Sequence, residues 1–208
     1  MTATTAPAET SGAASPFEPV VEIVERRAAA YQLLRELLEP PTPALARRLG
    51  DGTLAAALRE AVAWFGAEAR WFDRAADALD GAMTPVPPYP ALASEHQRLL
   101  DAEAGEAGDA AIVTAELDAL GALVTQEAQA WHSEDAPTAA ATRQRLQERL
   151  TRGLGAWADE LAAEIGPRAA FSIYPAAAEA LCRFVDLELG RGFSSTRLPW
   201  RDRSAPQR

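Results

Sequence analysis

Residues 20–41 read VVEIVERRAAAYQLLRELLEPP, and this stretch decides the fold. Its large apolar side chains recur mostly at steps of three and four residues, the spacing that gathers them on one face of an α-helix. They are Val20, Ile23, Val24, Tyr31, Leu34, Leu37 and Leu38. We expect this helix to end before Pro40 and Pro41, because proline lacks an N–H and clashes with the preceding turn.

The same helical periodicity covers most of the remaining chain, and no stretch shows convincing strand alternation. Thr42 and Pro43 are typical of an N-cap and a first helical position. The predicted helices after residue 41 are a short one closed by Gly50, one or two over 53–80 broken near Gly66, and others over 91–102, 109–132 and 138–165. After Gly166 and Pro167 we expect a last helix, interrupted near Tyr174 and Pro175, that ends before Gly190. The sequence therefore predicts an all-α, single-domain helical bundle.

Composition divides the chain into three parts. We expect a disordered N-terminal segment at residues 1–16, a helical domain at 17–193 and a flexible tail at 194–208, since both ends are of low complexity. The Pro-rich stretch PVPPYP at residues 85–90 cannot be helical, so it is either a connection between two helical halves or an extended loop folded against the body. Halves joined in this way can be exchanged between copies, which leaves a monomer and a domain-swapped dimer both open.

The charge balance excludes several classes of protein. There are 20 basic and 30 acidic residues, giving a net charge of −10, and every basic residue is arginine. A nucleic-acid binder needs a basic surface, and Schiff-base or P-loop chemistry needs a lysine. The one cysteine, Cys182, cannot form an internal disulfide and lies in an apolar run, so we expect a buried, unreactive thiol.

The sequence also lacks recognisable targeting signals. Residues 1–16 have neither a basic region nor an apolar core, so they do not resemble a secretory leader. We interpret Arg26 and Arg27 as two surface residues of a helix, because charges return too soon for an export signal. No segment has the roughly 20 apolar residues that span a bilayer. We therefore expect a cytoplasmic protein.

Few residues offer chemistry, and we expect neither a metal nor a cofactor. His96 follows Glu95 directly, and adjacent helical residues point about 100° apart, so the two form no metal pair. His132 is expected at a helix end, where a partly protonated imidazole suits the dipole. An aromatic stripe of Trp64, Phe65, Trp71 and Phe72 is more typical of core packing than of a ligand platform.

Four segments, in this order, resemble the TorD/DmsD family of redox-enzyme maturation proteins. They are YQLLRELLEPP at 31–41, LASEHQRLL at 92–100, GDAAIVTAELDAL at 108–120, and the set Leu150, Leu154, Trp157, Phe171, Tyr174, Leu181, Phe184 and Asp186. Three positions depart from the family's pattern: His96 replaces a tyrosine, Ala110 the histidine of an Asp-His pair, and Gly153 a histidine. The segment between Leu100 and Asp109 is also shorter than in typical members.

The resemblance implies a cytoplasmic chaperone for the catalytic subunit of a molybdenum-containing oxidoreductase. Such a protein binds the cofactor-free subunit, its twin-arginine leader, or both, until the molybdopterin is inserted, and thereby delays export. We expect Glu95, Asp109 and Glu116 to be the carboxylates on the leader's side, with Arg98 orienting the groove through an ion pair. Each of them also suits an ordinary helix cap or surface ion pair.

Besides the non-enzymatic chaperone that the resemblance implies, two other functions remain open from the sequence. The second hypothesis is an accessory subunit retained in a finished redox complex. A helical enzyme using Glu95 and Glu116 as acid and base is the third hypothesis, and no convergent nucleophile or cofactor motif accompanies those carboxylates.

Overall fold

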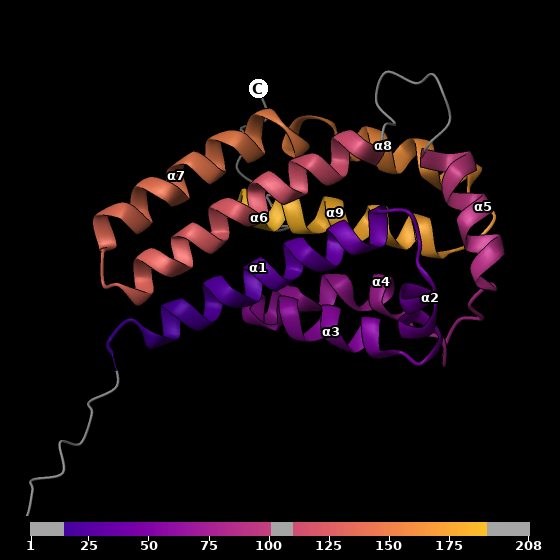
Figure 1. Cartoon of the computed structure of the whole chain (residues 1–208), viewed down its shortest axis with the longest axis horizontal. Coiled ribbons are helices and arrows are strands. Elements are labelled where there is room, and N and C mark those ends of the chain that lie inside the picture. Colours follow the sequence, from indigo (N-terminus) through magenta and orange to yellow (C-terminus); the bar gives the residue numbers. More distant parts are fainter. Residues whose placement is uncertain (1–14, 101–109, 191–208) are drawn as a thin grey trace, which may run out of the picture.

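The computed structural model describes residues 15–100 and 110–190, and within these ranges it contains helices and no strand. Figure 1 shows the arrangement. The elements are α1 (Glu18–Leu38), α2 (Pro43–Gly50), α3 (Thr53–Val62), the 3₁₀ helix η1 (Ala63–Phe72), α4 (Asp73–Ala78), α5 (Tyr89–Leu100), α6 (Ala110–His132), α7 (Ala136–Arg152), α8 (Leu154–Arg168) and α9 (Ile173–Glu188). The prediction of an all-α bundle is confirmed.

Helix α1 is the central element. It packs along α6 and also contacts α3 and α9, while α7 covers α6 and α8 packs on α9 (Figure 1). Residues 85–88 have no regular structure and lie in the connection between α4 and α5. The prediction that all of 85–90 is non-helical is wrong at its end, because α5 begins at Tyr89 and includes Pro90 in its first turn, where a missing N–H costs little. Because α1 and α3 lie before this connection and α6 and α9 after it, the two parts share one core.

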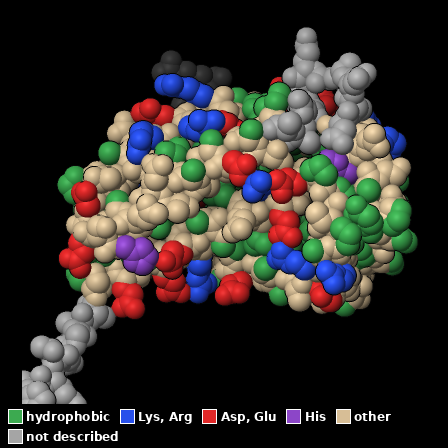
Figure 2. Space-filling view, viewed as in Figure 1, with side chains coloured by type: hydrophobic (Ala, Val, Ile, Leu, Met, Phe, Trp, Pro, Cys, Tyr) green, Lys and Arg blue, Asp and Glu red, His purple; other side chains and the backbone are tan. Residues whose placement is uncertain are grey.

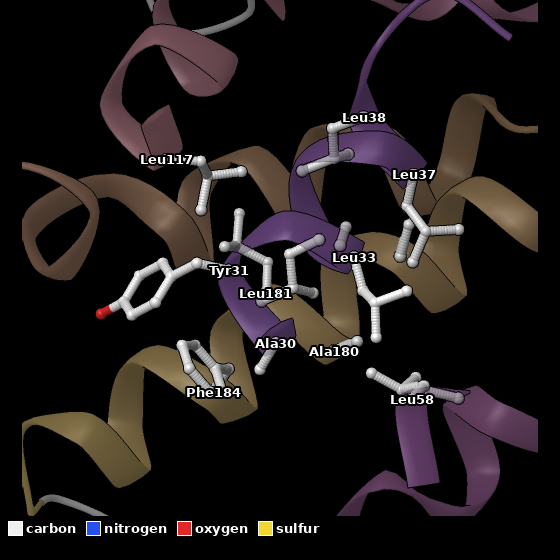
Figure 3. Packing of buried hydrophobic residues seen from close by; sticks show 14 of the residues in the cluster. Ala30, Tyr31, Leu33, Leu37, Leu38, Leu58, Leu117, Ala180, Leu181 and Phe184 are labelled. Atoms are coloured by element: carbon white, nitrogen blue, oxygen red, sulfur yellow. The ribbon is translucent and has the colours of Figure 1, made fainter. Parts of the chain in front are cut away.

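That core is built from leucine, alanine and a few aromatic side chains (Figure 3). Tyr31 of α1 meets Phe184 of α9 edge to face, with the ring centroids 4.8 Å apart. Leu34 of α1 and Leu181 of α9 are fully buried beside them. The apolar spacing that predicts α1 therefore also selects its buried face.

The ends of the first helices follow from local chemistry. The Thr42 hydroxyl accepts the backbone N–H of Leu45, as an N-cap does, and Pro43 opens α2. Helix α1 ends at Leu38, two residues before Pro40. The predicted disordered segment at 1–16 falls almost wholly, and the tail at 194–208 wholly, outside the described residues.

Two residues of the aromatic stripe, Phe65 and Phe72, pack in or against the core, as predicted. Phe65 stacks on Phe72 at 6.2 Å and meets Phe184 edge to face at 6.0 Å. Phe72 is 1% exposed. Gly66 interrupts this segment with φ 60°, a left-handed value that glycine adopts without strain.

The prediction of one helix over 138–165 is wrong. The structure has two, α7 and α8, which meet at Gly153. A Cβ at position 153 would lie 3.1 Å from the Arg149 carbonyl oxygen and against the end of the Glu116 side chain from α6, so a larger residue here needs its neighbours to shift. Pro167 lies inside the last turn of α8, and Pro175 lies in the first turn of α9, where a missing N–H costs little.

Candidate functional site

Two of the predicted site residues, Glu95 and Arg98, lie together on α5. Arg98 Nη2 and Nε donate to the two Glu95 oxygens at 2.8 and 3.1 Å. Glu95 also accepts the backbone N–H of Ala170, and only 5% of the residue is exposed. This carboxylate therefore joins α5 to the loop between α8 and α9 and is already fully engaged inside the protein.

Neighbouring residues of the same motif also connect helices. His96 Nε2 lies 3.2 Å from the Leu38 carbonyl oxygen, and the Tyr174 hydroxyl donates to the Leu92 carbonyl at 2.9 Å. The rings of His96 and Tyr174 meet edge to face at 6.0 Å. The residues that carry the family resemblance in α5 thus hold this helix against α1 and α9.

Glu116 lies elsewhere, at the junction of α6, α7 and α8. Its Oε2 accepts Arg149 Nη2 at 2.6 Å, and its other oxygen touches Gly153. It lines a groove of about 480 Å³ that also contains Arg145 and Arg152. Three arginines against the two carboxylates of Glu116 and Glu148 leave this groove with an excess of positive charge, which opposes the approach of another cation.

The predicted leader-binding set is therefore not one cluster in the described residues. Glu95 and Arg98 pair with each other, and neither forms a hydrogen bond or ion pair with Glu116 there. Asp109 lies outside the described residues.

A buried ionic cluster, which the sequence analysis missed, joins α1, α6 and α9. Arg27 Nε and Nη2 donate to the two Glu188 oxygens, both at 2.7 Å, and Nη1 donates to Glu127 at 3.0 Å. The Tyr31 hydroxyl donates to Glu188 at 3.4 Å. Arg143 Nη1 lies 3.8 and 3.9 Å from the Glu127 and Glu188 carboxylates.

The interpretation of Arg27 as a surface residue is wrong, since it is only 2% exposed. Burial by itself lowers the pKa of its guanidinium, but the hydrogen bonds and charge of Glu188, aided by Glu127, outweigh this and hold the pKa above its ordinary value. Burial, followed by the charge of Glu188, raises the pKa of Tyr31. The signal in the sequence was the spacing: Arg27 follows Val24 by three residues and precedes Tyr31 by four, on the apolar face.

A groove of about 540 Å³ lies between α1 and α6, on the outer side of α1. At one end Glu25 Oε1 pairs with His132 Nε2 at 3.0 Å. At the other end Asp118 Oδ1 lies 2.8 Å from Arg35 Nε. These carboxylate side chains are 57% and 54% exposed, so both remain accessible to solvent.

A second groove, of about 580 Å³, lies on the other flank of α1, against α3. Both grooves share Glu25, Ala29 and Gln32. The second groove is lined by the acidic Glu22, Glu25, Glu36 and Glu60, the basic Arg26 and Arg48, and the apolar Leu33, Ala57 and Ala61 among its residues. Figure 2 shows acidic and basic side chains interspersed on the face that α1 crosses.

No signal in the sequence marks these grooves, because they arise from how α1 packs between α3 and α6. In the described ranges, 15–100 and 110–190, no group of three or more histidine, cysteine or acidic side chains is arranged to hold a metal ion. Nor is any helix of this part of the chain long and apolar enough to cross a membrane. Burial, with the nearby Asp159, raises the pKa of Cys182 to about 12, as expected for an unreactive thiol.

Comparisons with known proteins return no match for this chain, whether against protein-family models, curated proteins or solved structures.

Proposed function

We propose that this chain is a cytoplasmic chaperone of the TorD/DmsD type. It binds the cofactor-free catalytic subunit of a molybdenum-containing oxidoreductase, or its twin-arginine leader, and holds it until the cofactor is inserted. The observation that carries the proposal is the pair of open, acid-lined grooves on the two flanks of α1. Grooves of this kind admit a basic peptide, and the net charge of −10 attracts it.

The packing of the motif segments supports the proposal as well. The segment at 31–41 meets the segment at 92–100 through the contact of His96 with the Leu38 carbonyl. Two residues of the fourth group, which runs from Leu150 to Asp186, contact both of these segments. The Tyr174 hydroxyl donates to the Leu92 carbonyl, and the Phe184 ring packs against the Tyr31 ring. The four quoted segments therefore contribute to one core, as landmarks of a single fold do.

The chemistry of the groove walls also fits a leader peptide. Arginine guanidinium groups prefer carboxylates, which they bind through two parallel hydrogen bonds. Exposed carboxylates at Glu22, Glu25 and Glu60 provide such partners. Ala57 adds a half-buried apolar position to this wall, whereas the neighbouring Leu33 and Ala61 are buried. This supports placing client binding beside α1 and not at the buried Glu95.

Affinity copurification from the native cytoplasm, under conditions that induce anaerobic respiration, tests the proposal. Mass spectrometry should identify one molybdoenzyme subunit, enriched in its cofactor-free, leader-bearing form. Stoichiometric recovery with the mature holoenzyme would instead favour an accessory subunit. Recovery of no oxidoreductase, with a client demonstrably expressed, would overturn the proposal.

A further inference from the structure

Helix α7 carries an arginine-rich face in a chain whose net charge is −10. The charged residues of this helix are four arginines and one glutamate. Arg145, Arg149 and Arg152 stand at steps of four and three residues, which places them within about 60° of one another around the helix axis. All three are exposed, and all three line the groove of about 480 Å³ at the junction of α6, α7 and α8. Helix α7 therefore presents a row of arginines, one per turn, to solvent.

The charge of this row is only partly neutralised inside the protein. Arg149 Nη2 donates to Glu116 at 2.6 Å. Arg145 Nη2 donates to the neutral Thr142 hydroxyl at 3.0 Å, and no carboxylate of the described residues lies within ion-pair distance of it. Arg152 has no hydrogen bond or ion pair within the described ranges. Because each guanidinium group has five N–H donors, Arg145 and Arg152 both offer donors to an acceptor from outside.

The spacing of these two arginines favours carboxylates on a helix over a single phosphate. Arg145 and Arg152 are about two turns apart, which is about 10 Å along α7. One phosphate would need both guanidinium groups to converge past Arg149, which Glu116 already holds. A second helix lying along α7 has the same pitch of about 5.4 Å. Carboxylates at positions i, i+4 and i+7 of that helix therefore meet the arginines at one per turn.

The remaining features of the groove restrict what binds there. Leu123 of α6 is half-buried in the groove wall and provides an apolar contact for a packed helix. A basic peptide is opposed by the excess of positive charge. A second copy of this chain is a poor occupant, because each copy carries a net charge of −10 and two copies repel one another.

We propose that the arginine face of α7 binds an acidic helical segment of a partner protein, whose carboxylates pair with Arg145 and Arg152 while an apolar side chain contacts Leu123. Arginine clusters recognise acidic motifs through charge-assisted hydrogen bonds that are often bidentate. The inference goes beyond the proposed function, since the basic leader of a client does not fit this face. It holds whether or not the chain is a chaperone, so its tests are independent of client recovery.

Fluorescent peptides test the inference by anisotropy at low ionic strength. The probe is an alanine–glutamine peptide of about 16 residues, long enough for partial helicity, with glutamates at i, i+4 and i+7. The control peptide has the same composition with glutamates at i, i+5 and i+10, so that they point to different sides of the helix. The probe should bind about fivefold more tightly, the difference expected for two exposed ion pairs. Equal affinities, or no binding by the probe, would overturn the inference.

Two double variants of matched charge locate the site. Arg145→Gln with Arg152→Gln should weaken binding of the probe about fivefold. Arg47→Gln with Arg74→Gln, exposed on α2 and α4, should leave it unchanged. The same affinity in both variants would place the peptide elsewhere and contradict the inference. Inorganic phosphate should displace the probe no better than chloride at equal ionic strength, and stronger displacement would instead assign the groove to a phosphate-bearing ligand.

Discussion

Two sets of ion pairs lie on α1, one buried and one exposed to solvent. On the inner face, Arg27 is enclosed with Glu127 and Glu188, and each of these residues is at most 5% exposed. On the outer face, Glu25 and Asp118 are more than half exposed and pair with His132 and Arg35. The chemistry is similar, but burial fixes the inner set in one geometry and leaves the outer set free to exchange partners.

Removing Arg27 should produce the largest effect. Arg27→Met leaves two buried carboxylates facing one another, and breaking a buried ion pair in this way costs about 3–5 kcal/mol. Chemical denaturation should show that loss in the free energy of unfolding. The adjacent Arg26→Met is the matched control, because Arg26 pairs only with the exposed Glu22, and it should change stability by less than about 1 kcal/mol. Equal effects of the two substitutions would contradict the comparison.

A triple variant sharpens the same point. Arg27→Met with Glu127→Leu and Glu188→Leu removes the three buried charges together, and the remaining Arg143, whose side chain is 32% exposed, can be hydrated. Replacing a buried ion cluster by apolar residues is often neutral or stabilising. We expect the triple variant to recover most of the stability lost by Arg27→Met, measured by the same denaturation. A triple variant less stable than the single one would show that the charges themselves are required.

Glu95 should give an intermediate effect. Glu95→Ala removes the acceptor of the Ala170 N–H and of two Arg98 N–H groups, although Arg98 keeps its hydrogen bond to the Arg168 carbonyl, and the expected loss is about 1–3 kcal/mol. Gln97→Ala, on the exposed side of the same helix, should change little. Chemical denaturation of the two variants measures this loss in the free energy of unfolding. An unchanged Glu95→Ala protein would mean that this carboxylate does not hold α5 in place.

The outer pairs should matter little for stability. Glu25→Gln with Asp118→Asn should change the free energy of unfolding by less than about 1 kcal/mol, and that difference should shrink as salt screens the charges. Denaturation at low and high ionic strength checks this. A loss as large as that of Arg27→Met would mean that the outer pairs are also part of the framework.

The smallest effect concerns the start of α7. The Thr138 hydroxyl and backbone N–H hold the pKa of Asp135 below its ordinary value of 3.8. A lowered pKa means that Asp135 stabilises the fold while charged, above that ordinary value, and that this contribution is lost as the pH falls through the lowered pKa. The difference in melting temperature between wild type and Asp135→Asn should therefore narrow in acid. A difference that stays constant with pH would contradict this.

Much of the fold follows from local sequence, whereas the burial of Arg27 depends on distant partners. The end of α1 before Pro40 and the cap of α2 at Thr42 depend on neighbouring residues, and both were predicted. The break at Gly153 was not, although glycine is a weak helix former at any interior position. Arg27 lies on the predicted apolar stripe, but its partners are 100 and 161 residues away.

The candidate site was less predictable than the fold. The family resemblance selected Glu95 and Arg98, and the structure pairs the buried Glu95 with the half-exposed Arg98. The grooves beside α1 combine side chains from α1 with others from α3 or α6. Such a combination has no signature in a single sequence, since neither helix pattern specifies which faces meet.

The most direct test of the account compares client recovery by three forms of the chain. Wild type, Glu25→Gln with Asp118→Asn, and the control Glu160→Gln with Glu164→Gln, exposed on α8, are each used to capture proteins from the same cytoplasm. We predict that wild type and control recover the cofactor-free, leader-bearing molybdoenzyme subunit and that the folded groove variant recovers markedly less. Equal recovery by all three forms would contradict the assignment of client binding to the outer face of α1.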